Sequence, residues 1–329
     1  MNAPTRPWRR TLVAVLAASG LALGTAAAVA APGQPDSART TRAPATGHQA
    51  ATGHQAAAAT CDPEASSLRP SGPPQVTSGS FMAKIRARGY LLAGVDQSTY
   101  HFGFLSPLTG NIEGFDIDMI RAVAKAIFGD PGKVVFKAIS DAQRIPDVSN
   151  GTVDIVAHTM TITCDRWQHE AFSSEYFRDG QRLMVRSDSG VHEIEDLAGK
   201  RVCVAKATTT YDSLRRFRGP VEVAEDDAAD CQVLFERDEV DAVTSNEIVL
   251  RGYAQGDPYA SIVGRPLTSE PRGLAFPQGE VDFVRFVNAV LDRLRADGTL
   301  AGILRRYLPG LTADQLAAAM HPPLYGRPW

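Results

Sequence analysis

Segments with the pattern of β-strands and segments with the pattern of α-helices alternate along this chain from Tyr90 onward. The run YLLAGV at 90–95 has the continuous apolar character of a buried strand. Residues 116–128 then place apolar side chains at the spacing of an amphipathic helix, and further strand patterns follow at 134–136 and 153–157. Such alternation is typical of an α/β fold with largely parallel sheets.

The alternation then starts again in a second part of the chain. Strand patterns lie at 182–185, 201–205, 221–223 and 240–243, with helical patterns at 206–217 and 227–237. A last strand pattern at 273–276 and a long amphipathic helix from Phe283 to Leu294 look like additions to the first part. The pattern therefore predicts two α/β lobes joined by two crossings of the chain.

The first 60 residues have a different composition. Arg6, Arg9 and Arg10 precede an apolar run at 12–31 with a small-x-small site at 28–30, which predicts a signal peptide over residues 1–30. The run is also long enough to remain as a membrane anchor. Residues 31–60 are rich in Ala, Thr, Gly, Pro and Gln, which predicts a disordered linker. We therefore expect an exported, extracytoplasmic protein, either associated with the cell surface or secreted.

Charge and cysteine content narrow the possibilities further. A formal net charge of -3 gives no electrostatic reason to expect nucleic-acid binding. Four cysteines in an exported chain suggest disulfides, and the absence of a CxxC pattern argues against a zinc site. Cys203 and Cys231 fall in one predicted lobe, so we expect Cys203–Cys231 and, by elimination, Cys61–Cys164.

The segment TMTITCDR at 159–166 follows the strand pattern at 153–157. A guanidinium such as that of Arg166 offers two parallel donors to a carboxylate, and Thr163 is a suitable N-cap for a helix that carries it. The segment therefore predicts a carboxylate-binding site. The alternative is a surface arginine near the start of a helix.

Five segments in this order resemble the family 3 extracellular solute-binding proteins. They are GNIEGFDIDMIRAVAKAIFG (110–129), RIPDVSNGTVDIVAHTMTITCDR (144–166), IEDLAGKRVCVAKATTT (194–210), EVDAV (239–243) and RADGT (295–299). The resemblance covers about Phe81 to Pro309. Within the family, DQSTYHFGF at 96–104 is similar to the actinobacterial glutamate/glutamine-binding lipoproteins of amino-acid ABC transporters.

The resemblance implies a two-lobe, type II periplasmic-binding-protein fold with two crossover hinge strands. The large lobe would comprise 61–181 plus 269–309, the small lobe 182–268, and 310–329 a C-terminal tail that looks helical at LTADQLAAAM. It also implies a monomer without metal or cofactor. Such a protein binds glutamate, aspartate or glutamine in a cleft between the lobes and delivers it to an ABC transporter permease or reports it to a membrane sensor.

The family's ligand contacts map onto several residues here. Arg166 would hold the α-carboxylate of the ligand, and Thr159 and Thr161 would contact it through backbone and hydroxyl groups. His158 either lines the pocket or fills space. Thr208, Thr209 and Thr210 would bind an anionic group at a loop-to-helix junction, or one of them simply caps the helix; Ala207 replaces a glycine common in this loop.

Three further positions bear on the ligand's charge. Asn246 stands where the family usually has an aspartate for the ligand ammonium, so either Glu247 supplies the missing charge or that end is held more weakly. Asp96 contributes to the site or caps a turn. Arg144 would lie near a distal carboxylate, which favours an acidic amino acid, or it forms an ion pair with Asp141 or Asp147.

The aromatic residues Tyr100, Phe102 and Phe104 cover the aliphatic part of the ligand or belong to the core. Two other function classes stay open: a signalling module with a degenerate cleft, and an enzyme similar to cyclohexadienyl dehydratases. Catalysis would need a positioned acid, for which Glu170, Glu175 and Glu247 are the candidates.

Overall fold

The computed structural model describes residues 67–323 and 325–327, all of which belong to the compact unit Ala57–Trp329. The predicted signal peptide at 1–30 and the predicted linker at 31–60 lie outside the described residues. Within the described part, no helix has the length and apolar character needed to cross a membrane.

The first lobe is built on a five-stranded sheet in the order β5-β1-β6-β15-β7. β1 (Leu91–Val95) runs parallel to β5 (Val134–Ala138) and β6 (Ile155–Ala157), whereas β15 (Ala275–Pro277) is antiparallel to β6 and to β7 (Glu170–Phe172). The helices that accompany this sheet are α1 (Phe81–Arg88), α2 (Phe115–Phe128), α3 (Arg144–Ser149), α7 (Val281–Ala296) and α8 (Thr299–Tyr307). The apolar faces of α2 and α7 are buried in one core with β1 and β6, as their periodicity predicts.

The second lobe is built on a five-stranded sheet in the order β11-β10-β12-β9-β13. β10 (Arg201–Ala205) is parallel to β11 (Val221–Glu225) and β12 (Ala242–Asn246), while β9 (Gln181–Arg186) is antiparallel to β12 and to β13 (Ala260–Val263). Its helices are α4 (Thr209–Leu214), α5 (Ala228–Glu236) and α6 (Glu247–Ala254). The expectation of largely parallel sheets is therefore wrong in part, because β9, the strand by which the chain enters this lobe, runs against the other four strands of the sheet.

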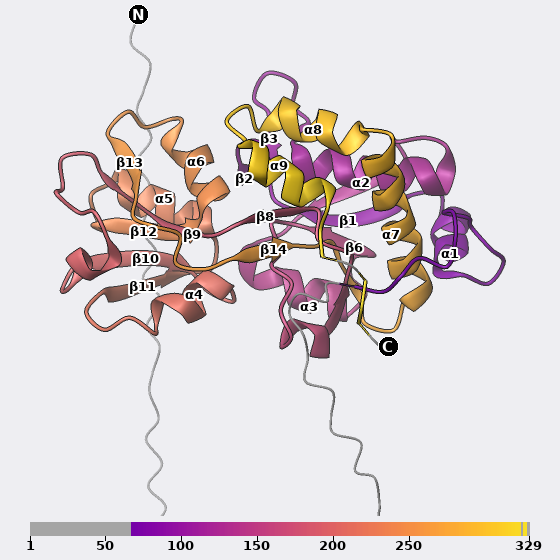
Figure 1. Ribbon diagram of the computed structural model, residues 1–329, viewed down its shortest axis with the longest axis horizontal. Helices are drawn as coiled ribbons and strands as arrows, with labels where there is room; N and C mark the ends of the chain where they lie inside the picture. The colour runs from indigo at the N-terminus through magenta and orange to yellow at the C-terminus, as the bar shows by residue number, and fades with distance from the viewer. Residues whose placement is uncertain (1–66, 324, 328–329) are drawn as a thin grey trace, which may run out of the picture. The chain divides into compact units, whose positions relative to one another are not determined.

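Two strands connect the lobes (Figure 1). β8 (Phe177–Asp179) leads into β9, and β14 (Glu270–Arg272) returns the chain to the first lobe; the two pair antiparallel, with Arg272 opposite Phe177. The Arg272 side chain is fully buried, and its Nη2 lies 2.5 Å from Asp179 Oδ1. The predicted pair of crossover strands is confirmed.

Short elements complete the described chain. β2 (Ser98–Thr99), β3 (Gly103–Leu105) and β4 (Ile112–Glu113) form a small antiparallel sheet, and single 3-10 turns lie at η1 (Asp141–Gln143), η2 (Arg166–Gln168) and η3 (Ile194–Leu197). The predicted helix in the tail is present as α9 (Ala313–Met320). Its N-cap Thr312 accepts a hydrogen bond from Gln315 N, and α9 packs against β8 and α8.

A disulfide joins Cys203 in β10 to Cys231 in α5, as predicted. Both cysteines are fully buried, so the bond fixes α5 against its sheet. The second predicted pair includes Cys61, which lies outside the described residues, and stays a prediction.

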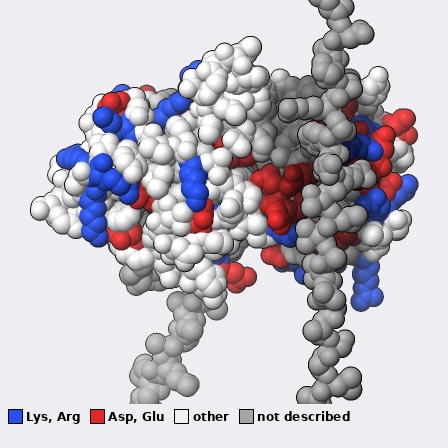
Figure 2. Space-filling model, turned by 180° about the vertical axis from the view of Figure 1, so that it is seen from behind, with Lys and Arg blue, Asp and Glu red and all other residues white. Residues whose placement is uncertain are grey.

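Basic and acidic side chains are intermixed over the rear face, apart from a group of acidic side chains near its centre (Figure 2). Lys and Arg side chains gather at the left end of that face, with acidic side chains beside them.

Candidate functional site

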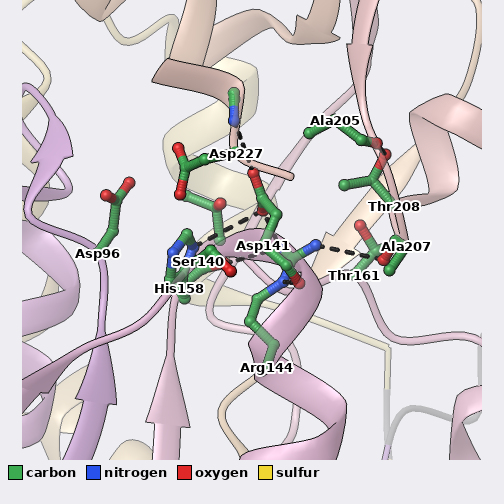
Figure 3. A network of polar contacts seen from close by, with 12 residues as sticks. Asp96, Ser140, Asp141, Arg144, His158, Thr161, Ala205, Ala207, Thr208 and Asp227 are labelled. Atoms are coloured by element: carbon green, nitrogen blue, oxygen red, sulfur yellow. Dashed lines mark hydrogen bonds and ion pairs between the residues drawn. The ribbon is translucent and has the colours of Figure 1, made fainter. Parts of the chain in front are cut away.

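A polar pocket lies where the two lobes meet (Figure 3). The first lobe contributes the ends of β1 and β6, the turn η1 and the start of α3. The second contributes the end of β12 and the N-termini of α4 and α5. Its lining comprises Asp96, Thr99, Asp141, Arg144, His158, Thr159, Thr208, Asp227, Ala228, Ser245, Asn246 and Val249. Ligands of α/β proteins bind at the carboxyl ends of parallel strands, and this pocket lies at those ends in both sheets.

Hydrogen bonds join one lobe to the other at and beside this pocket. Arg144 Nη2 and Arg166 Nη2 both donate to the carbonyl oxygen of Ala207, at 3.5 and 3.2 Å. Ala228 N donates to Asp141 Oδ2 at 3.1 Å. Two guanidinium groups of the first lobe therefore converge on one acceptor of the second.

Ala207 itself has an unusual backbone conformation. Its φ is +55°, in the left-handed region that glycine adopts without a Cβ penalty. Ala207 therefore adopts, at some cost in strain, a conformation that suits glycine better, and its carbonyl oxygen accepts hydrogen bonds from Arg144 and Arg166.

Arg144 forms the ion pair that the sequence left open as its alternative role. Its Nη1 lies 2.9 Å from Asp141 Oδ1, and its Nη1 and Nε also donate to the carbonyl oxygens of His158 and Asp141. Burial raises the pKa of Asp141, but the combined effect of Arg144 and its other partners is larger and lowers it. The pKa of Asp141 therefore lies below its usual range. Asp147 is paired with Lys137 instead.

Arg166 is 7% exposed and lies beside the pocket rather than in its lining. Its Nη1 donates to the Thr161 carbonyl at 2.8 Å, and its backbone N–H donates to Thr163 Oγ1 at 3.2 Å. The element that carries it is the single turn η2, not the helix expected from the sequence. Burial, together with the nearby Arg144, lowers the pKa of Arg166 to about 10, so the group is a buried cation at neutral pH.

The hydroxyls of Thr161 and Thr209 bind a carboxylate of the protein itself. Both donate to Glu270 Oε2, Thr209 at 2.5 Å. Thr268 Oγ1 donates to Glu270 Oε1 at 2.9 Å. Because Thr161 belongs to the first lobe, Thr209 to the second and Glu270 to the hinge strand β14, this cluster ties both lobes to the hinge.

Thr208 caps the helix α4. Its Oγ1 accepts from Tyr211 N at 3.0 Å and donates to the Ala205 carbonyl at 2.7 Å. Thr210 Oγ1 lies 2.8 Å from the same hydroxyl. Thr208 is thus the helix cap, in agreement with the alternative that one of the three threonines caps the helix. Its side chain also lines the pocket.

His158 and Thr159 both line the pocket at the end of β6. His158 Nε2 lies 3.0 Å from the Ile139 carbonyl, to which it can only donate, while its buried Nδ1 has no hydrogen-bond partner. Thr159 has φ +46°, and its N–H donates to Asp116 Oδ2 at 2.9 Å. The backbone of Thr159 is thus held in place from behind the pocket.

Asp96 and Asn246 face the pocket from opposite lobes. Asp96 Oδ1 accepts from the N–H and hydroxyl of Ser98, so it caps a turn and lines the site as well. Asn246 is 7% exposed, and its Oδ1 has no hydrogen-bond partner. Glu247 pairs with Arg182 and Arg251 and does not belong to this lining, so it is not the source of the charge that Asn246 lacks.

Asp227 is a lining residue that the sequence interpretation missed. It is the N-cap of α5, with Oδ1 accepting from Ala229 N at 2.9 Å. Burial raises its pKa to about 6, with further contributions from Asp141 and Asp96. An aspartate at the start of a predicted helix is an ordinary capping signal. The sequence therefore contains no indication that this aspartate also lines a pocket between the lobes.

The chain matches the model of the bacterial extracellular solute-binding proteins, family 3, over residues 91–310. This span covers both lobes and both hinge strands. The chain belongs to this family.

Individual solute-binding proteins show the same likeness. The glutamine-binding protein GlnH of the Bacillus subtilis ABC transporter is 33% identical over 69% of this chain and 84% of its own length. The glutamate-binding protein GluB of Corynebacterium glutamicum is 28% identical over 69% and 81%. A crystal structure of a P235GK mutant of ArgBP from T. maritima has a TM-score of 0.65 and 30% identity, covering 69% of this chain and 99% of that one.

The acids considered for an enzymatic role lie away from the pocket of this family 3 protein. Glu170 is fully buried in β7, Glu175 pairs with Arg178 at 2.6 Å, and Glu247 is paired as described above. Of the three aromatic candidates, Phe102 is in the core against Phe115 and Phe177. Neither Tyr100 nor Phe104 belongs to the pocket lining within the described chain.

Proposed function

We propose that this family 3 solute-binding protein is an exported, monomeric receptor that binds a polar L-amino acid between its lobes, without catalysis. The bound amino acid is delivered to an ABC transporter permease or reported to a membrane sensor. The glutamine-binding and glutamate-binding relatives support an amino-acid ligand and an ABC transporter partner.

The convergence of Arg144 and Arg166 on the Ala207 carbonyl carries this proposal. A carbonyl oxygen has only a partial charge, whereas a carboxylate offers two charged acceptors that match the fork of a guanidinium. When the lobes separate, the Ala207 acceptor leaves, and the α-carboxylate of an amino acid takes its place. Renewed closure about β8 and β14 then encloses the ligand.

The pocket also provides acceptors for the α-ammonium group. Asn246 Oδ1 is buried and unpartnered, and the Asp96 carboxylate faces it from the other lobe. An ammonium group has three donors and no acceptor, so an amide oxygen and a carboxylate together suit it. The charge of Asp96 thereby compensates for the asparagine at position 246.

A thermal-shift panel of the twenty L-amino acids, with their D-enantiomers as controls, tests the proposal. A ligand present at one hundred times its dissociation constant stabilises the folded protein by about 2.7 kcal/mol. We expect a raised melting temperature with a small set of polar L-amino acids and none with the D-forms. A panel without any shift contradicts the proposal and favours the degenerate-cleft alternative.

A further inference from the structure

Asp227 has a negative charge that the recognition of the α-carboxylate and α-ammonium groups leaves unused. We infer that Asp227 recognises the ligand's side chain and selects one with N–H donors, a cation or an amide, over a carboxylate. The inference rests on the proposed function and adds a specificity-determining residue to the same site.

The position of Asp227 brings it into the pocket from the second lobe. The next residue, Ala228, donates its N–H to Asp141 Oδ2 across the lobe boundary, which fixes the start of α5 against η1. In Figure 3 the Asp227 side chain lies between those of Asp96 and Asp141. The disulfide at Cys231 holds the same helix from the other side. The carboxylate is therefore held at the cleft by both lobes.

The balance of charges leaves Asp227 without a cation. Among the described residues Asp141 is paired with Arg144, whereas neither Asp96 nor Asp227 takes part in an ion pair. Asp96 is matched by the ligand's α-ammonium in the proposed binding mode. A glutamate or aspartate side chain would then meet an uncompensated carboxylate, whereas a guanidinium, ammonium or amide group would donate to it.

Two independent observations indicate a ligand here. The buried Asn246 Oδ1 and the buried His158 Nδ1 both lack a hydrogen-bond partner, and both residues line the pocket with Asp227. In the proposed binding mode Asn246 Oδ1 accepts from the α-ammonium group. His158 Nδ1 and the Asp227 carboxylate then remain as acceptors for an N–H-rich side chain. The Nε2–H of His158 is directed to the Ile139 carbonyl, which leaves Nδ1 as an acceptor.

The space for a side chain lies beside Asp227. A second cavity of about 330 Å³ shares Asp96 and Asp227 with the first pocket and continues past Ser140, Gln143 and Asp230. A long side chain that enters this cavity passes both carboxylates. Its lining contains acidic, neutral polar and apolar residues, and no basic residue of the described chain.

Calorimetric titration of the full chain at pH 7.5 with L-arginine, L-lysine, L-glutamine and L-glutamate tests the inference. We expect arginine or glutamine to bind more tightly than glutamate. Asp227→Ser keeps an N-cap oxygen for Ala229 but removes the carboxylate, and should weaken the preferred ligand by about tenfold or more, as for a lost hydrogen bond to a charged group. Asp226→Asn is the control, because Asp226 is exposed, pairs with Lys206 and lies outside the lining.

A second variant identifies the kind of donor. Asp227→Asn retains an acceptor oxygen without the charge, so it weakens arginine by about tenfold while largely preserving glutamine. Two results would contradict the role of Asp227 without contradicting the proposed function. One is that the wild type binds glutamate most tightly; the other is that the wild type and Asp227→Ser have equal affinities. No binding of any of the four amino acids, nor of any other in the thermal-shift panel, contradicts the proposed function itself.

Discussion

Glu170 shows how a single buried side chain outside the pocket sets a pH dependence of stability. It lies in β7, is fully buried, and neither carboxylate oxygen has a hydrogen-bond partner. Burial raises its pKa to about 7, against the opposing effect of Arg166 and Arg144. The folded protein therefore holds a proton on Glu170 at pH values where the unfolded chain has lost it, and stability falls as the pH rises from about 4.5 to 7.

We expect Glu170→Gln to stabilise the protein at pH 8, because the amide needs no deprotonation in the buried site. The gain should be on the order of 2 kcal/mol at pH 8 and should vanish near pH 4. Urea unfolding at the two pH values measures it. A stability difference that is the same at both pH values contradicts the assignment of the titration to Glu170.

Individual residues of the site were predictable to the extent that one local motif defines them. The segment 159–166 led to Arg166. For Arg144 the sequence offered an ion pair with Asp141 or Asp147, and the structure has the pair with Asp141. Asp227 and Glu270 were not predictable, because a helix cap and a single acid in a strand carry no signal of what faces them. Their partners come from segments that lie far away in the sequence.

The hinge strand β14 contains a contact that links ligand site and lobe closure. Glu270 accepts hydrogen bonds from Thr161 and Thr209, one in each lobe. Burial raises the pKa of Glu270, but Arg272 and the three threonine hydroxyls lower it below its usual range, so the carboxylate is ionised. Hydrogen bonds to a charged group contribute about 1.5–3 kcal/mol each, enough to shift an equilibrium between open and closed lobes.

We expect Glu270→Ala to favour the open arrangement of the lobes, because the link between Thr161 and Thr209 is lost. Small-angle X-ray scattering without added amino acid should give a larger radius of gyration than for the wild type. Glu195→Ala, a change on the exposed turn η3, serves as the control. An unchanged radius of gyration in Glu270→Ala would show that Glu270 does not hold the lobes together.

The helices and strands were predictable where the apolar periodicity is strong. The direction of each strand relative to its neighbours in the sheet was not predictable. The helices α2 and α7 and the strands β1 and β10 follow the apolar patterns of the sequence. The antiparallel β9 and β15 look like any buried strand, since a continuous apolar run does not encode direction. Direction is set by the path of the chain through β8 and β14.

The site exists only where the two lobes of the molecule meet. The hydrogen bonds from Arg144 and Arg166 to Ala207, and from Ala228 to Asp141, join one half of the fold to the other. The family resemblance predicted a cleft at this place, but the pairing of side chains across it depends on the relative position of the lobes. In the proposed function, binding is therefore coupled to hinge motion. A ligand shifts the equilibrium between the open and the closed form only if it interacts differently with the two.

The central claim is that a buried guanidinium holds a ligand carboxylate in this cleft. Calorimetric titration tests it. The wild type, Arg166→Lys and Arg166→Ala are each titrated with the amino acid that gives the largest shift in melting temperature. We expect one-to-one binding to the wild type, clearly weaker binding to Arg166→Lys, which keeps the charge but loses the fork, and at least about hundredfold weaker binding to Arg166→Ala. Circular dichroism confirms that the variants are folded. Equal affinity of a folded Arg166→Ala and the wild type would contradict the account.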